Sequence, residues 1–240
     1  MNTTIKTDSA TSVSIDHARL LKLVNTQVRQ IEKRFPNRGI TTVAKELRET
    51  TIKAPATCAE ILKPNRWIRA GVFLLGALML AVLGYGISQL DFRMTDAWSI
   101  IEGIDAGIST AVYLGVTMVF LVSLEIRQRR QQMVKALLEL RALAHVIDMH
   151  QMTKDPESLI FSEEEMDEED QSGLTPFLLE RYLDYAADLL SIIGKVAAWY
   201  AQEINDPKVL VAITELEQLT GDMNRKIWQK IQIITAAHLR

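Results

Sequence analysis

The residues best able to do chemistry gather in one short stretch of the chain. Arg141, His145 and Asp148 share a helix face at positions i, i+4 and i+7, and His150 follows. Histidine and carboxylate side chains on facing helices are the ligands of metal sites in helical bundles. One functional hypothesis from this stretch is a metal-binding bundle or a membrane-anchored enzyme that uses the His145/Asp148 face.

The patterns that mark known metal and catalytic sites are incomplete here. A carboxylate-bridged two-metal site needs Glu-x-x-His on two helices, but no Glu lies three residues before His145 or His150. The sequence also lacks a His-Glu-x-x-His zinc motif, a phosphate-binding glycine loop and a nucleophile elbow. We therefore expect a polar, salt-bridged helix face with no metal, no cofactor and no catalytic role.

Hydroxyl groups are the other candidate, because they lie in two long uncharged stretches. The hydroxyl-bearing residues there are Ser88, Ser109, Thr110, Thr117 and Ser123, with Tyr85 and Tyr113, and none of them carries a charge. Proton relays and ion carriers use ionisable residues inside the membrane, so a pump has little support. A second hypothesis is an oligomeric channel or transport subunit whose pore is lined by Thr110 and Thr117.

The uncharged stretches themselves predict a transmembrane hairpin. Ala70–Leu90 and Ala106–Leu124 contain 21 and 19 residues without a charged side chain. At about 1.5 Å per residue each spans roughly 30 Å, the thickness of the hydrocarbon core of a bilayer. We predict a hairpin over residues 67–126, with spans at about 69–90 and 105–125.

Most of the basic residues near the predicted hairpin lie at its two outer ends and not in the segment that connects the spans. The connecting segment Asp91–Asp105 holds four acidic residues and only Arg93 as a basic one. The basic residues lie before the first span and after the second: Lys53, Lys63, Arg66, Arg69, Arg127, Arg129, Arg130 and Lys135. The positive-inside rule then predicts a multi-pass protein of the inner (plasma) membrane with both termini in the cytoplasm.

Rows of small residues in the spans predict close helix packing. Gly103, Gly107, Ala111 and Gly115 are spaced four apart in the second span, and Ala77 and Ala81 form a shorter row in the first. Small side chains let two helices approach closely in lipid. These rows predict packing within the hairpin and self-association into a homo-oligomer.

The second span continues into an aqueous helical extension over residues 127–152. No Gly or Pro occurs between Val116 and Asp155, so one helix is expected as far as about Gln151. Its apolar residues recur at alternating spacings of three and four: Leu137, Leu140, Ala144 and Ile147, preceded by Met133. This pattern is typical of a coiled-coil seam, which needs a partner helix.

The remaining segments complete an all-α chain, because no strand pattern appears. In the N-terminal part we expect a helix over residues 15–35, a short helix over 42–49 and an irregular segment over 50–64. Glu163–Asp170 places seven carboxylates in eight positions, which predicts a solvated linker. The predicted segments are a mobile tail (1–14), a cytoplasmic helical segment (15–66), the hairpin (67–126), its extension (127–152), an acidic linker (153–174) and a C-terminal helical hairpin (175–240).

Together these segments predict a two-span transmembrane hairpin with a cytoplasmic three- or four-helix bundle. The leading hypothesis is a non-enzymatic integral membrane protein that acts as a self-associating, membrane-tethered assembly or regulatory module. Its expected partners are the lipid bilayer, copies of itself and a cytoplasmic protein. Nucleic acid is not expected, because the one basic cluster, Arg127 to Arg130, flanks a span.

Overall fold

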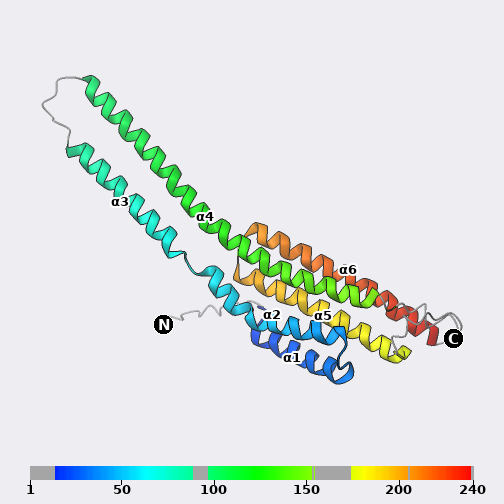
Figure 1. Ribbon diagram of the computed structural model, residues 1–240. Helices are drawn as coiled ribbons and strands as arrows, with labels where there is room; N and C mark the ends of the chain where they lie inside the picture. The colour runs from blue at the N-terminus through cyan, green and yellow to red at the C-terminus, as the bar shows by residue number, and fades with distance from the viewer. Residues whose placement is uncertain (1–13, 89–96, 153, 155–173, 205, 239–240) are drawn as a thin grey trace, which may run out of the picture. The chain divides into compact units, whose positions relative to one another are not determined.

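The computed structural model describes residues 14–88, 97–152, 154, 174–204 and 206–238 (Figure 1). Every regular element in these ranges is an α-helix, as predicted. Most of the predicted mobile tail and acidic linker lies outside the described residues. The helices are α1 (His17–Arg34), α2 (Gly39–Leu62), α3 (Arg66–Ser88), α4 (Ala97–Met152), α5 (Pro176–Glu203) and α6 (Pro207–His238).

The chain forms two compact units, which we call the bundle and the hairpin. The bundle comprises the described residues up to Cys58 and from Val134 onward, and the hairpin comprises Ala59–Met133. Helix α2 ends in the hairpin, and α4 begins there and ends in the bundle. The single helix expected to run from the second span to about Gln151 is confirmed by α4.

Helix α1 lies within the range where a helix was expected, and it is amphipathic. The Asp16 side chain caps its first turn by accepting a hydrogen bond from Ala18 N at 3.0 Å. Its buried residues are Leu20, Val24, Val28 and Ile31. These lie three or four positions apart, so one face of α1 packs on the bundle and the opposite face meets water.

Helix α2 is longer than the sequence indicated. We expected a helix over 42–49 and irregular chain over 50–64, but α2 continues through Pro55 to Leu62. Proline has no N–H to bond the carbonyl four residues earlier, which here belongs to Thr51. The ring nitrogen Nε2 of His17 lies 2.9 Å from that carbonyl and donates to it in place of the missing N–H. A partner from another helix therefore stabilises the carbonyl that Pro55 leaves unpaired.

The core of the bundle draws on five helices, one more than the largest number expected. Helix α5 contributes buried residues from two neighbouring apolar rows, from Leu179 to Tyr200, and α1 and α6 pack against it. The extension of α4 adds Leu140 and Ala144, each with 0% of its surface exposed. Because apolar residues occur on two sides of α5, this helix lies at the centre of the bundle.

Helices α5 and α6 begin in the same way. The Thr175 hydroxyl accepts a hydrogen bond from Leu178 N at 3.3 Å, with Pro176 at the first helical position. The Asp206 carboxylate accepts from Lys208 N at 2.9 Å. Both starts combine a capping side chain with a proline whose missing N–H costs nothing there.

Candidate functional site

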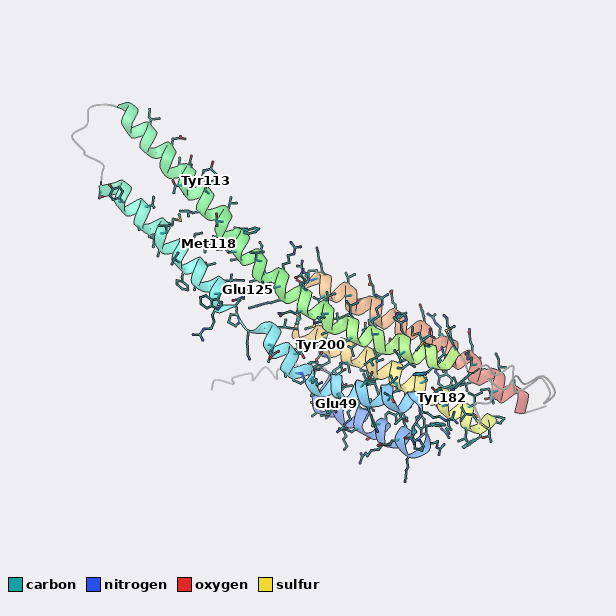
Figure 2. All side chains as sticks on the ribbon, in the orientation of Figure 1. Glu49, Tyr113, Met118, Glu125, Tyr182 and Tyr200 are labelled. Atoms are coloured by element: carbon teal, nitrogen blue, oxygen red, sulfur yellow. The ribbon has the colours of Figure 1, made fainter. Side chains whose placement is uncertain are left out.

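The hairpin exposes apolar side chains along its length. Two helices among the described residues are long and apolar enough to cross a membrane, and no residue in the most apolar stretch of either helix is buried. On α3, Phe73 is 81% exposed, and on α4, Tyr113 and Val119 are 74% and 67% exposed (Figure 2). The core helix of a soluble protein would bury such residues. An apolar environment outside the chain fits this surface.

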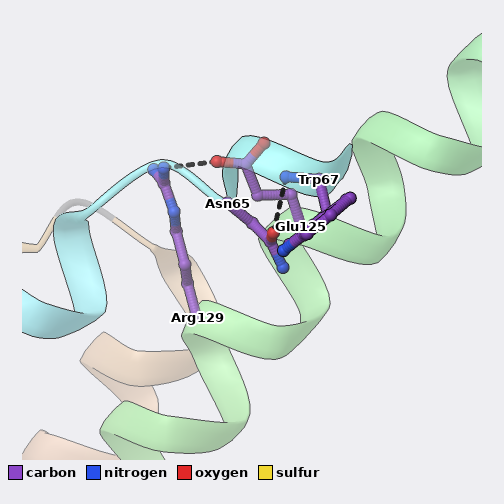
Figure 3. Close-up of polar contacts among 4 residues, drawn as sticks. All are labelled: Asn65, Trp67, Glu125 and Arg129. Atoms are coloured by element: carbon purple, nitrogen blue, oxygen red, sulfur yellow. Dashed lines mark hydrogen bonds and ion pairs between the residues drawn. The ribbon is translucent and has the colours of Figure 1, made fainter. Parts of the chain in front are cut away.

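A polar cluster marks the end of the hairpin where α3 begins (Figure 3). The Asn65 side chain accepts a hydrogen bond from Trp67 N at 3.1 Å and so caps the first turn of α3. The Trp67 side chain is 88% exposed. One turn apart on α4, Arg129 Nη2 donates to Glu125 Oε1 at 2.5 Å. Cap, aromatic residue and ion pair all lie within a few residues of the apolar surface.

The ion pair explains how a carboxylate lies so close to that surface. The Glu125 side chain is only 16% exposed, and a carboxylate withdrawn from water needs a charged or hydrogen-bonding partner. Arg129 supplies that partner from the same helix, with its own side chain 34% exposed. Its Nε is buried and has no acceptor. The pair allows α4 to pass from an apolar to a polar surrounding within one turn.

Hydroxyl groups in the second span, including that of Thr117, donate hydrogen bonds to backbone carbonyls of their own helix. Thr117 Oγ1 donates to Tyr113 O at 2.8 Å, and Ser123 Oγ donates to Val119 O at 2.7 Å. Thr117 is exposed and Thr110 is half-buried. Local bonding of this kind is common for hydroxyls in helices. Pore lining by Thr110 and Thr117 stays a prediction with no observation in its favour.

The small residues of α4 are not in close contact with another helix. A Cβ atom built on Gly103, Gly107 or Gly115 would meet nothing within 4 Å. Ala111 is half-buried, whereas Ala77 and Ala81 on α3 are exposed. The hairpin therefore leaves open the close approach that this row of small residues permits, and packing between copies through it stays a prediction.

The heptad seam of the α4 extension lies inside the bundle. Leu137, Leu140, Ala144 and Ile147 are exposed by 3% or less, because the other helices of the bundle cover them. The sequence predicted a seam that needs a partner helix. In the structure the partner that it needs is supplied within the chain, and a role in joining copies stays a prediction.

A second apolar row on α4, which sequence reasoning missed, faces water. Its members follow at spacings of four, three, four and three: Leu138, Ala142, His145, Met149 and Met152, all exposed. Leu138, Met149 and Met152 are 55%, 58% and 68% exposed. The buried seam contains apolar residues only, whereas this row is interrupted by His145, so the seam dominated the sequence pattern. We call this second row the outer α4 stripe.

The residues once considered for metal binding point to different neighbours. His145 belongs to the outer α4 stripe, and Asp148 Oδ1 accepts from Gln151 Nε2 at 2.6 Å. The His150 ring lies against Gly39 so closely that a Cβ there would collide with it. Within the described ranges, no group of three or more His, Cys, Asp or Glu residues is placed to hold a metal ion. This geometry gives no support to the hypotheses of a metal-binding bundle or a membrane-anchored enzyme.

The buried titratable groups are held in their neutral forms. Burial raises the pKa of Cys58 to about 12, with a smaller contribution from the charge of Glu203. Burial likewise raises the pKa of Tyr182 and of Tyr200 to about 12. A thiol or phenol of such high pKa is a poor nucleophile at neutral pH. All three side chains are buried, and Figure 2 labels the two tyrosines within the bundle.

Comparison with known proteins adds no relative to this picture. No family model, curated protein or solved structure matches the chain.

Proposed function

We propose that the protein is a non-enzymatic, self-associating module that is tethered to the inner membrane and serves assembly or regulation. The hairpin is the membrane anchor, and both chain termini lie with the bundle on the cytoplasmic side. Copies pair through α4. The lipid bilayer and a second copy of the chain are the partners.

The membrane part of the proposal is supported by the hairpin and its charges. Large apolar side chains are exposed along α3 and α4, and exposed Arg66, Arg69 and Arg127 follow where the apolar surface ends. Basic residues of this kind favour the cytoplasmic side of a bilayer. Trp67 has the position of an interfacial aromatic anchor, because its ring is exposed in the first turn of α3.

The observation that carries self-association is the outer α4 stripe. Apolar side chains at alternating spacings of four and three make a helix face that packs on a like face in a coiled coil. Two copies inserted the same way in one bilayer have parallel α4 helices. Identical stripes then meet in register, Leu138 with Leu138 and Met149 with Met149. The membrane anchor also raises the effective concentration of the two stripes, which offsets their short length.

A cross-linking experiment tests the pairing of the stripes. In native membranes, Met149→Cys should form an oxidised dimer, because the two cysteines lie face to face in the paired helices. The matched control is Glu139→Cys, which is also exposed on α4 but lies off the stripe. Native Cys58 is 3% exposed and does not interfere. Cross-linking through Glu139→Cys but not Met149→Cys would contradict the proposal.

Membrane insertion and orientation need a separate measurement. The wild-type protein should remain in the membrane pellet after alkaline extraction, and a tag fused after Arg240 should be inaccessible from outside intact cells. Leu78→Arg places a charge near the middle of α3, at a cost of about 3 kcal/mol, and should reduce the membrane-bound fraction. A protein that stays in solution without detergent would overturn the proposal as a whole.

A further inference from the structure

The outward face of α1 is a row of cations. Arg19, Lys22, Arg29 and Lys33 are all exposed and follow the 3.6-residue repeat of the helix, with Thr26 at the intervening position. Over these fifteen positions the helix rises about 21 Å. We call this row the α1 basic stripe. It lies opposite the apolar face by which α1 packs on the bundle.

The stripe has little acidic compensation within the described part of the chain. Helix α1 contains five Lys or Arg residues and one acidic residue, Glu32, which pairs at 2.8 Å with Lys45 of α2. Arg19 lies 3.7 Å from Asp16 at the start of the helix. No ion pair between described residues neutralises Lys22, Arg29 or Lys33. Like charges four residues apart on a helix repel one another, so this arrangement costs stability in the free bundle.

A hollow borders the stripe on the side of α2. Its volume is about 410 Å³, and Arg29 and Arg48 line it together with Asn25, Val28 and Glu32. The Nε atom of Arg48 is buried and has no acceptor. A buried N–H without a partner costs about 1–3 kcal/mol, and an acceptor that entered the hollow would recover part of this cost.

A second hollow borders the stripe on the side of α5. It has a volume of about 540 Å³, and its lining residues are Gln30, Lys33, Arg34, Arg181 and Tyr185. The guanidinium groups of Arg34 and Arg181 each lie 5.8 Å from the ring centroid of Phe177, which holds both near the hollow. Arg181 also pairs with Asp184 at 3.3 Å, whereas no ion pair between described residues neutralises Lys33 or Arg34. Lys33 and Arg34 therefore extend the positive charge of the stripe into this hollow.

We propose that the α1 basic stripe binds an acidic helical segment of a partner protein. Glutamates or aspartates three or four residues apart on a helix recur every 4.5–6 Å or so, the same interval as the cations of α1. Side chains beside that acidic row enter the two hollows. An acceptor on the partner reaches Arg48, and a carboxylate reaches Arg34 and Arg181. The site lies wholly in the bundle and does not depend on pairing through α4.

Polypeptide fits this surface better than a phosphate polymer. The hollows offer Val28, Asn25, Gln30 and Tyr185 beside the cations, so they suit apolar and neutral polar side chains as well as charges. The guanidinium groups provide the planar, forked donors that match carboxylates. A phosphate polymer would use the cations and leave the hollows empty.

The test measures binding of a synthetic helix by the full-length protein in detergent. The probe is a fluorescent alanine-rich peptide with glutamates at positions i, i+3, i+7, i+10 and i+14, and its control carries lysines there. The glutamate peptide should bind and the lysine peptide should not. Changing Lys22→Glu, Arg29→Glu and Lys33→Glu together should weaken binding about tenfold, because three exposed charge pairs are reversed.

A charge-matched variant separates the stripe from general attraction. Lys208→Glu, Arg225→Glu and Lys226→Glu change the net charge equally on exposed positions of α6 and should leave the affinity unchanged. Arg48→Met tests the hollow at constant stripe charge and should weaken binding about threefold. Equal loss in both triple variants, or displacement of the peptide by a lower concentration of single-stranded oligothymidylate, would overturn the proposal.

Discussion

The hairpin and the bundle are built from similar residues that have opposite surroundings. Leu80 on α3 is 72% exposed, whereas Leu190 on α5 is 0% exposed. Phe73 is 81% exposed, whereas Tyr200, a larger and more polar side chain, is 2% exposed. Tyr200 lies inside the bundle, and Tyr113 and Met118 point away from α4 in the hairpin (Figure 2).

This difference shows which environment each unit needs. The bundle covers its apolar side chains with other helices of the same chain, so it is stabilised by its own core. The described part of the hairpin consists mainly of α3 and the first part of α4. Two helices that pack only on each other leave most of their surface uncovered. Its apolar side chains remain exposed unless lipid or another copy covers them. Three measurements test this contrast, and the one with the largest expected effect comes first.

The largest effect is expected from paired leucine truncations. Leu190→Ala should lower the free energy of unfolding of the bundle by about 2–5 kcal/mol, because it leaves a cavity in a closed core. Leu78→Ala, at a side chain 51% exposed, should change it by less than about 1 kcal/mol. Alkylation of Cys58 in increasing urea reports the opening of the bundle, since this buried thiol reacts only when exposed. Equal losses for the two variants would contradict the contrast.

A smaller effect tests how α1 stabilises α2 near Pro55. His17→Ala removes the donor to the Thr51 carbonyl and should cost the bundle about 1–3 kcal/mol, because Thr51 is fully buried. In a Pro55→Ala background the new backbone N–H can bond the same carbonyl. The cost of His17→Ala should then fall. Unfolding of the two single variants and the double variant gives the coupling energy. The His17 ring also packs on Trp199, with the ring centroids 5.1 Å apart, and strict additivity would show that His17 acts only through that contact.

The smallest effect is a pH dependence at Asp188 on α5. Burial is the main cause that raises the pKa of Asp188 above its usual 3.8, and the charge of Asp184 adds to it. The folded state therefore holds the proton to a higher pH than the unfolded state, and the contribution of Asp188 to stability is lost as pH rises through the folded pKa.

Replacing Asp188 with asparagine removes that titration and keeps an acceptor for Gln27 Nε2. Because the carboxyl is partly exposed, the gain in stability at pH 7 should be small, about 0.3 kcal/mol. Urea unfolding at pH 4 and pH 7 should show a weaker pH dependence than in the wild type. An unchanged slope of stability against pH would mean that other groups determine it.

Much of the fold could be predicted because its signals are local. The caps at Thr175 and Asp206 depend on residues within one helical turn, and so does the buried face of α1. The length of α2 could not be predicted, because its continuation through Pro55 depends on the bond between His17 and Thr51, which are 34 residues apart in the sequence. Long-range hydrogen bonds of this kind leave no periodic signal in the sequence.

Some features of the candidate sites could also be predicted from the sequence, and others could not. The uncharged stretches and their flanking cations are visible directly in the sequence, since both are runs of one residue type. The two apolar rows of the α4 extension are both present as patterns, but the pattern does not say which row the chain itself covers. Burial of Leu140 and exposure of Met149 were needed to separate them. The α1 basic stripe likewise stands out only once Glu32 is known to face Lys45.

The sequence alone determined that the chain is helical, where most helices begin, and which two stretches are long and apolar enough to cross a membrane. These properties follow from hydrogen bonds and side-chain patterns within a few residues. The tertiary structure decided which faces remain available to partners. That decision depends on which distant helices meet, because burial is a property of the packed chain and each amphipathic helix can be covered in more than one way.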